Sequence, residues 1–320
     1  MSRRNLSPAE LFEAARNGDR GALARVLSLL ERGDATAREV GRMAYKYSGN
    51  GYTVGITGAP GAGKSTLTSA LIKHLRSLEM EIAVLAIDPS SPFTGGAILG
   101  DRVRMQDHAT DPGVFIRSMA TRGHLGGLSL STPEAIRLLD AVGREWILVE
   151  TVGVGQVEVE IAGKADTTVV VLNPGWGDSV QANKAGLMEI ADVFVINKAD
   201  RKGADETRRD IEQMLELTDL APDDWHPVII PTVGTTGEGV PELWNAIREH
   251  RAFIETNNVL KNRREFRLRE ELREIVARRL ELRARELCTG ERWEDLQQRV
   301  IDRKTDPWSA ADEMLQGVGA

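Results

Sequence analysis

The most informative motif of this chain is Val54-Gly-Ile-Thr-Gly-Ala-Pro-Gly-Ala-Gly-Lys-Ser-Thr66. A short β-branched run ends at Gly58, and Gly63-Lys64-Ser65 completes the pattern G-x-x-x-x-G-K-[ST] between an expected strand and an expected helix. The glycines let main-chain N–H groups turn toward phosphate oxygens, and the helix directs the positive end of its dipole at them. The stretch therefore predicts a nucleoside triphosphate site, in which Lys64 reaches the β- and γ-phosphates and Ser65 binds Mg²⁺. The residues expected around the phosphates are Gly58, Ala59, Pro60, Gly61, Ala62, Gly63, Lys64, Ser65 and Thr66.

Short apolar runs alternate with helical periodicity from residue 52 to about residue 250. The expected strands are 52–57, 82–87, 114–118, 146–150, 168–172, 193–197 and 228–230, and the expected helices between them include 65–79, 132–142, 203–217 and 240–255. Such alternation predicts an α/β fold, a mostly parallel P-loop NTPase sheet flanked by helices. Ligands bind at the carboxyl ends of the strands in these sheets. Asp88, Glu150 and Asn197 fall at these ends.

The two ends of the chain predict helical extensions rather than further strands. Ser7-Pro8-Ala9-Glu10 is a capping box with proline at the first helical position. After about residue 257 the sequence is rich in Arg and Glu, with Leu268, Leu272, Val276 and Leu280 at every fourth position. A narrow apolar seam of this kind packs on another helix, either the N-terminal helices or a second subunit. We expect an N-terminal helical extension over 1–50, a P-loop domain over 51–256 and a C-terminal helical arm over 257–320.

The amino-acid composition argues against several classes of function. The formal net charge of −7 argues against a nucleic-acid partner, which usually needs a clustered basic face. Cys288 is the single cysteine, so an intrachain disulfide framework and a multi-cysteine metal site are excluded. No apolar stretch approaches the ~20 residues of a membrane span. We expect a cytoplasmic protein without a membrane partner.

The stretch Asn197-Lys-Ala-Asp200 indicates guanine rather than adenine. The Asp200 carboxylate can accept from guanine N1–H and from the 2-amino group, and adenine offers neither donor. A base that leaves a buried carboxylate without a hydrogen-bond donor is rejected strongly. We expect Asn197 to brace the loops, Lys198 to lie over the base, and Ala199 to belong to the same loop. Val233, Gly234 and Thr235 form a turn where a second guanine-contacting loop should come, although many GTPases have Ser-Ala at Val233-Gly234.

Three acidic residues are candidates to complete the magnesium site. Asp88 and Glu150 end strands, and Asp101 follows a glycine-rich loop. Mg²⁺ takes oxygen ligands and keeps several waters, so carboxylates often act through those waters. The alternatives are a turn before proline for Asp88 and a helix cap for Asp101. Gly153, three residues after Glu150, is placed to sense the γ-phosphate with its amide.

Seven segments together resemble the MeaB/ArgK-type GTPases, relatives of the methylmalonic aciduria type A protein. The segments are Gly58–Thr66, Asp88-Pro-Ser-Ser, Thr94-Gly-Gly-Ala-Ile-Leu-Gly-Asp101-Arg, Ser118-Met-Ala-Thr-Arg-Gly, Leu125-Gly-Gly-Leu, Glu150-Thr-Val-Gly-Val-Gly-Gln156 and Asn197-Lys-Ala-Asp200. The resemblance implies a GTPase that uses Mg²⁺ and binds GTP and GDP. It also implies a chaperone of an adenosylcobalamin-dependent methylmalonyl-CoA mutase, which gates cofactor loading and protects or reactivates the mutase, and a homodimer built through the C-terminal arm.

The same resemblance assigns roles to individual residues. Lys64, Asp88, Glu150 and Lys184 are implied in catalysis, with Asp88, Asp101 and Glu150 in the metal and switch regions. Residues 175–186 are similar to a third switch of the family, in which Lys184 and Gln181 are the side chains of interest. For both, a solvated helix start is the alternative. Val154 stands where Ras-like proteins have a catalytic glutamine, so we expect slow hydrolysis that a partner stimulates.

Three other functions remain open from the sequence. A nickel or cobalt metallochaperone GTPase would share the P-loop domain, but such proteins usually carry Cys/His clusters, and the five histidines here are scattered. A P-loop kinase has little use for guanine selection. The third alternative is a non-enzymatic structural partner that binds GTP incidentally. Its GTP affinity would not depend on Asp200.

Overall fold

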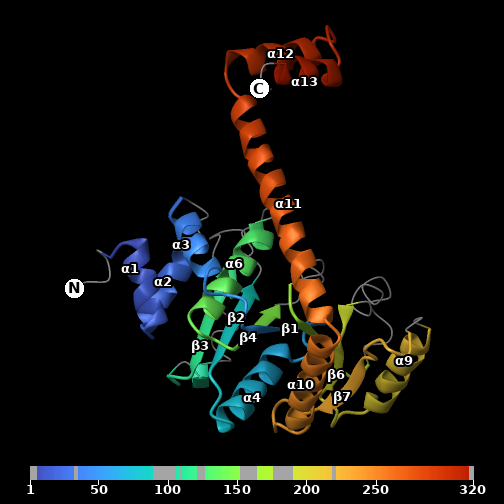
Figure 1. Cartoon of the computed structure of the whole chain (residues 1–320). Coiled ribbons are helices and arrows are strands. Elements are labelled where there is room, and N and C mark those ends of the chain that lie inside the picture. Colours follow the sequence, from blue (N-terminus) through green and yellow to red (C-terminus); the bar gives the residue numbers. More distant parts are fainter. Residues whose placement is uncertain are drawn as a thin grey trace. The chain divides into compact units, whose positions relative to one another are not determined.

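A computed structural model describes residues 6–31, 35–88, 106–108, 110–120, 127–151, 164–175, 190–217 and 221–316 of the chain. The chain divides into two compact units, Met1–Arg267 and Leu268–Ala320. Figure 1 labels most of their helices and strands. Among the helices of the described ranges, none has the length and apolar character needed to cross a membrane.

A parallel sheet forms the centre of the first unit. In the described residues it has seven strands in the order β3-β2-β4-β1-β5-β6-β7, all paired in parallel (Figure 1). The strands are β1 (Tyr52–Gly58), β2 (Ile82–Asp88), β3 (Val114–Ala120), β4 (Trp146–Thr151), β5 (Thr167–Leu172), β6 (Val193–Asn197) and β7 (Val228–Thr232). The predicted α/β fold is confirmed. Strand β1 lies between β4 and β5, so the chain adds strands first on one side of it and then on the other, and ligands bind at such switch points.

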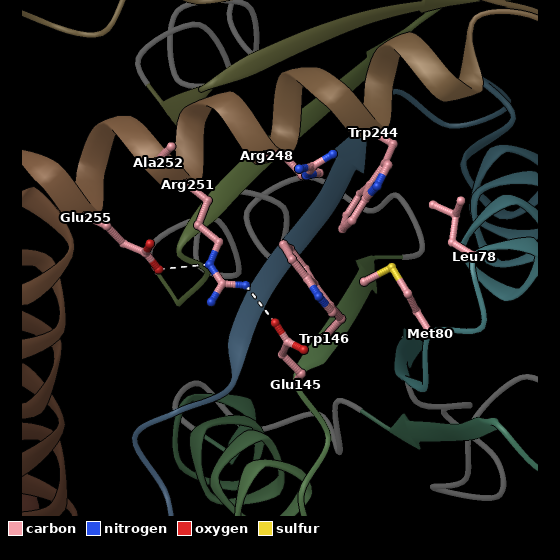
Figure 2. A pocket seen from close by; sticks show the side chains of 9 residues that line it. All are labelled: Leu78, Met80, Glu145, Trp146, Trp244, Arg248, Arg251, Ala252 and Glu255. Carbon is pink, nitrogen blue, oxygen red and sulfur yellow. Dashed lines mark hydrogen bonds and ion pairs between the residues drawn. The ribbon is translucent and has the colours of Figure 1, made fainter.

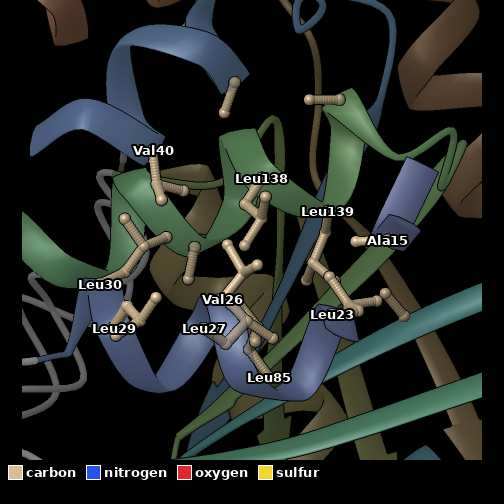
Figure 3. Packing of buried hydrophobic residues seen from close by; sticks show 14 of the residues in the cluster. Ala15, Leu23, Val26, Leu27, Leu29, Leu30, Val40, Leu85, Leu138 and Leu139 are labelled. Atoms are coloured by element: carbon tan, nitrogen blue, oxygen red, sulfur yellow. The ribbon is translucent and has the colours of Figure 1, made fainter. Parts of the chain in front are cut away.

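Helices cover both faces of the sheet because the strands are apolar on both sides. One face packs against α1 (Pro8–Arg16), α2 (Arg20–Leu30), α3 (Ala35–Tyr45) and α6 (Gly127–Ala141), with α9 (Ala204–Glu216) over β5 and β6. Figure 3 shows Leu23, Val26 and Leu27 of α2 packed against Leu138 and Leu139 of α6. The other face packs against α4 (Lys64–Ser77) and α10 (Val240–Thr256). A short 3₁₀ turn, η2, spans Gln106–His108.

Local sequence signals predicted several helix and strand boundaries correctly, and two observed boundaries differ from the predicted ones. The predicted capping box is present: the Ser7 hydroxyl accepts from the Glu10 amide at 3.3 Å, and the Glu10 carboxylate accepts from the Ser7 amide at 2.8 Å. Strand β7 continues through Pro231 to Thr232, which an edge strand tolerates because the missing N–H is not needed for pairing. Helix α6 begins at Gly127, before the expected residue 132, and contains Pro133. An internal proline costs a helical hydrogen bond, and α6 continues through it nonetheless.

The second unit is helical. Helix α11 (Val259–Leu287) begins in the first unit and continues into the second, which also contains α12 (Glu291–Ile301) and α13 (Pro307–Leu315). Leu296, Ala310 and Met314 form a small core between α12 and α13. The predicted seam of α11 lies exposed: Leu268, Leu272, Val276 and Leu280 are 42%, 62%, 49% and 62% accessible. The division into three domains at residues 50 and 256 stays a prediction.

Candidate functional site

The loop after β1 has a backbone that only glycine permits at two positions. Gly58 has φ of +131°, and a Cβ placed on it would lie 2.0 Å from the Val171 carbonyl oxygen on the neighbouring strand β5. Gly63 has φ of +91°, and its Cβ would lie 2.4 Å from Nδ2 of Asn197. Positive φ and close approach both exclude larger residues here. The loop is therefore held close to β5 and β6, with helix α4 starting directly after it at Lys64.

Lys64 lies inside the loop rather than in solvent. Its Nζ donates to the carbonyl oxygens of Gly58 at 2.6 Å and Ala59 at 3.2 Å, and the residue is 7% exposed. This buried ammonium group, which donates to two loop carbonyls, places a positive charge at the N-terminus of α4. Because the N-terminus of α4 adds its dipole at the same point, the loop is suited to a polyphosphate.

Ser65 and Glu150 meet at the carboxyl ends of β1 and β4. The Ser65 hydroxyl donates to Oε1 of Glu150 at 2.6 Å, and these residues are 6% and 1% exposed. The sheet register pairs Glu150 with Ile56 of β1, which fixes the carboxylate beside the loop. One residue later, the Thr151 hydroxyl donates to the Thr57 hydroxyl at 3.1 Å. A hydroxyl and a carboxylate side by side are hard oxygen ligands of the kind that Mg²⁺ prefers.

Asn197 joins three segments that are far apart in the sequence. Its Nδ2 donates to the Ala62 carbonyl at 2.8 Å, while its Oδ1 accepts from the Gly234 amide at 3.0 Å and from the Thr232 hydroxyl at 3.3 Å. The residue is 2% exposed, and its hydrogen bonds use both ends of the side-chain amide. Asn197 therefore fixes the end of β6 against the phosphate loop and against the loop after β7.

Lys198 and Asp200 lie toward solvent beside this junction. Lys198 has φ of +60°, and its Nζ donates to the Gly61 carbonyl at 2.7 Å, so its stem crosses toward the phosphate loop. The Ala199 amide donates to the Thr232 carbonyl at 3.0 Å, which ties this loop to the end of β7. Asp200 is exposed, as a residue that pairs with a ligand from solvent must be. The geometry leaves its carboxylate accessible to a base.

The structure thus brings together many of the residues predicted for the site. Gly58–Thr66, Glu150, Asn197–Asp200 and the turn Val233-Gly234-Thr235 gather at the carboxyl ends of β1, β4, β6 and β7. Asp88 ends β2, two strands from β1, and its backbone alone is described. Asp101, Gly153, Gln181 and Lys184 lie outside the described residues.

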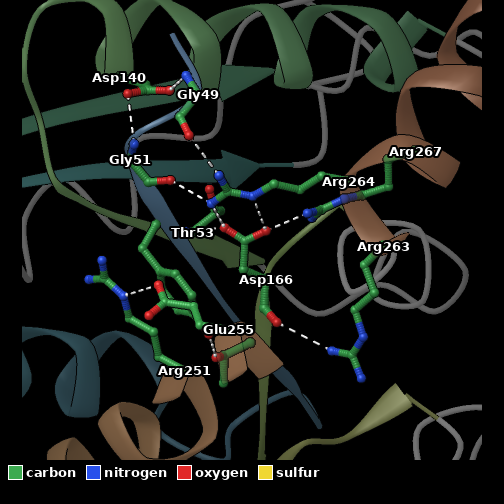
Figure 4. Close-up of polar contacts among 12 residues, drawn as sticks. Gly49, Gly51, Thr53, Asp140, Asp166, Arg251, Glu255, Arg263, Arg264 and Arg267 are labelled. Atoms are coloured by element: carbon green, nitrogen blue, oxygen red, sulfur yellow. Dashed lines mark hydrogen bonds and ion pairs between the residues drawn. The ribbon is translucent and has the colours of Figure 1, made fainter. Parts of the chain in front are cut away.

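Sequence reasoning missed a buried polar network at the opposite, amino ends of the strands (Figure 4). Asp166 directly precedes β5, is 2% exposed, and accepts from the Thr53 amide at 3.0 Å. Arg264 and Arg267 of α11 both form ion pairs with it, Arg264 at 2.6 Å. Burial raises the pKa of Asp166, but the hydrogen bond and charge of Arg264 and Arg267 outweigh it and hold the pKa below its usual value.

Asp192 repeats this arrangement one strand further along. It directly precedes β6, accepts from the Thr168 amide at 2.8 Å, and lies 3.1 Å from both His250 Nε2 and Arg263 Nη2. The sequence does contain a signal for both carboxylates. Each is an acidic residue immediately before a buried strand, and arginines are clustered within 263–267. The N-terminal part of α11 is therefore fixed to the sheet through two buried carboxylates.

Comparison with known proteins identifies the family of this chain. Residues 23–288 match the model of the family described as methylmalonyl Co-A mutase-associated GTPase MeaB. A relative from Pyrococcus abyssi is 52% identical over 314 residues, which cover 97% of this chain and 96% of the relative. The Escherichia coli relative named GTPase ArgK is 38% identical, over 83% of this chain and 82% of the relative.

A solved structure carries the same fold. The crystal structure titled LAO/AO transport system kinase superposes with a TM-score of 0.72 at 27% identity and covers 98% of this chain and 97% of that one. The family match spans the phosphate loop, the Ser65–Glu150 contact and the Asn197 junction. The chain therefore belongs to the MeaB family of methylmalonyl-CoA mutase-associated GTPases.

Proposed function

We propose that this GTPase is the chaperone of an adenosylcobalamin-dependent methylmalonyl-CoA mutase, whose cofactor loading it gates and which it protects or reactivates. The family is described as mutase-associated, and a mouse relative named methylmalonic aciduria type A homolog, mitochondrial, is 36% identical over 75% of this chain. The observation that carries the proposal is the Asn197 junction, which ties the phosphate loop to the loops proposed to read the base. A nucleotide bound there would contact all three segments at once.

The proposed reaction is attack of water on the γ-phosphorus of GTP, which breaks its bond to the β–γ bridging oxygen and releases GDP and inorganic phosphate. Lys64 and the loop amides would stabilise the charge that develops on the phosphate oxygens. Ser65, Glu150, Asp88 and Asp101 are the proposed magnesium ligands, directly or through waters, and the Ser65–Glu150 oxygen pair fits that ion. Bound magnesium would supply positive charge against the phosphates. Asp200 would accept from the guanine base, with Lys198 over its plane.

Val154 follows Gly153 where a water-orienting glutamine could stand, so we propose that hydrolysis is slow until the mutase binds. We also propose that Gln181 and Lys184 belong to the segment that responds to the mutase. A homodimer through α11 is proposed because its exposed apolar seam needs a covering partner.

The test compares GTP hydrolysis by the purified chain alone and with candidate adenosylcobalamin-dependent acyl-CoA mutases. We expect at least about tenfold stimulation by one mutase, and little hydrolysis by Lys64→Ala in either condition. Lys261→Ala, an exposed lysine on α11, is the matched control and should behave as the unmodified chain.

Adenosylcobalamin transfer to the mutase should depend on GTP in the same preparation. An unchanged rate with every candidate mutase, together with no complex in pull-downs, would reject the chaperone role. Transfer of γ-phosphate label to an acceptor other than water would instead favour a kinase.

A further inference from the structure

A hollow of about 440 Å³ lies at the end of the sheet opposite the phosphate loop. It is formed by residues that follow α4, by the start of β4 and by α10 (Figure 2). Trp146 is the first residue of β4, whereas Glu150 lies near its other end. The hollow is therefore separate from the proposed nucleotide site, and its volume is within the range of small-molecule pockets.

Trp146 lines this hollow and carries a buried hydrogen-bond donor without a partner among the described residues. The residue is 4% exposed, and within the described ranges its indole Nε1 has no acceptor. Its ring is held on two sides, by Trp244 with centroids 4.5 Å apart and by the Arg251 guanidinium 4.8 Å from the ring centre. Figure 2 shows the nitrogen edge of the indole facing Met80. Buried donors are normally paired, so a ligand with an acceptor oxygen would satisfy this one.

The two arginines of the hollow differ in their pairing. Arg251 bonds Glu255 at 2.8 Å and Glu145 at 3.2 Å, so its charge is already balanced by two carboxylates. Arg248, almost one turn earlier on α10, is exposed and forms no ion pair with any described residue. A ligand anion would therefore pair with Arg248 rather than with Arg251.

The rest of the lining is apolar. Leu78 follows α4 and is 50% exposed, and the Met80 thioether lies beside it along the rim. Exposed leucine next to a buried tryptophan edge favours a ligand with an apolar body. A ligand that has an acceptor oxygen, a negative charge and an apolar body is a carboxylate with an apolar group.

We propose that this hollow is a second ligand site, which binds a small carboxylate with an apolar body. The carboxylate pairs with Arg248 and accepts from the Trp146 N–H, while the body contacts Leu78 and Met80. This site is independent of the proposed mutase partnership and of nucleotide binding.

The test follows the indole N–H resonance of Trp146 in the ¹⁵N-labelled full chain without nucleotide. The Trp146→Phe variant assigns that resonance among the six tryptophans. Benzoate is the probe, with benzamide, benzylamine and inorganic phosphate as comparisons that lack the charge, reverse it or lack the apolar body. We expect benzoate to shift the resonance saturably and the three comparisons to bind at least about tenfold more weakly, since hydrogen bonds to charged groups are stronger than neutral ones.

Two variants make the result specific. Arg248→Leu keeps the apolar length of an exposed side chain and should weaken benzoate binding about tenfold or more. Arg42→Leu removes an exposed arginine of α3 and should leave benzoate binding unchanged. Equal binding of benzoate and benzamide, equal affinity in Arg248→Leu, or no saturable shift at all would each overturn the proposal.

Discussion

The Ser65 hydroxyl donates a 2.6 Å hydrogen bond to Oε1 of Glu150, and this contact joins residues 85 positions apart. It connects the first turn of α4 to the carboxyl end of β4. Because parallel strands present their carboxyl ends at one edge, a strand that ends in an acid next to the phosphate-loop strand delivers that acid to the loop. The pairing of β1 with β4 creates this contact.

Glu150→Gln keeps the size of the side chain and removes its charge. We expect the magnesium concentration needed for half-maximal GTP hydrolysis to rise about 10- to 100-fold, because the carboxylate supports the ion directly or through waters. Hydrolysis rates measured over a magnesium titration test this. Glu145→Gln, an exposed acid just before the same strand, is the control. An unaltered magnesium dependence in Glu150→Gln would remove Glu150 from the metal site.

Asp200→Asn exchanges an acceptor for a group that donates and accepts. Guanine would lose a charged acceptor for its N1–H and 2-amino group, whereas the xanthine C2 carbonyl could accept from the new amide. We expect GTP affinity to fall about 100-fold or more and XTP affinity to rise, as measured by calorimetry. The exposed Asp205 of α9 supplies the control, Asp205→Asn. Equal GTP affinity in Asp200→Asn and the unmodified chain would contradict base reading by Asp200.

Two glycines of the phosphate loop should respond differently to alanine. Gly58→Ala places a Cβ 2.0 Å from the Val171 carbonyl at φ of +131°, so we expect at least about 2 kcal/mol of lost stability. Gly61→Ala meets nothing within 4 Å at φ of +74°, so it should cost only about 1 kcal/mol of left-handed strain. Urea unfolding of the nucleotide-free proteins measures both. Equal losses would mean that the contact with β5 does not constrain the loop.

Asp166→Asn removes the charge that faces Arg264 and Arg267. We expect it to cost about 3 kcal/mol of stability, since two arginines then face a neutral amide at a buried site. The folded-state pKa of Asp166 lies below its usual value, so its stabilisation is full above the unfolded pKa of about 4 and is lost as pH falls through the folded pKa.

The unmodified protein should therefore lose more stability below about pH 4 than Asp166→Asn does. Urea unfolding midpoints over a series of acidic pH values measure this difference. Glu270→Gln, which breaks the pair of Glu270 with the well-exposed Arg273 on α11, should change stability by less than about 1 kcal/mol. Parallel acid curves for the unmodified chain and Asp166→Asn would show that the pair does not stabilise the fold.

Much of the fold follows from local sequence. Apolar β-branched runs such as 193–197 form strands because neither face of a central strand is polar. The Ser7–Glu10 capping box forms because both of its hydrogen bonds lie within one turn. Local reasoning misplaced two boundaries near prolines. Strand β7 pairs with β6 through Pro231 to Thr232, and α6 begins at Gly127 with Pro133 inside it.

Short segments alone predict the phosphate loop, the strands and the acids and amides at the strand ends, because each of these features depends on neighbouring residues. Only the folded chain shows which of these residues meet: Glu150 with Ser65, Asn197 with Ala62 and Gly234, and Asp166 with two arginines of α11. Strand order sets these contacts, and it results from packing helices on both faces of one sheet. That packing is a property of the whole chain, which no single segment encodes.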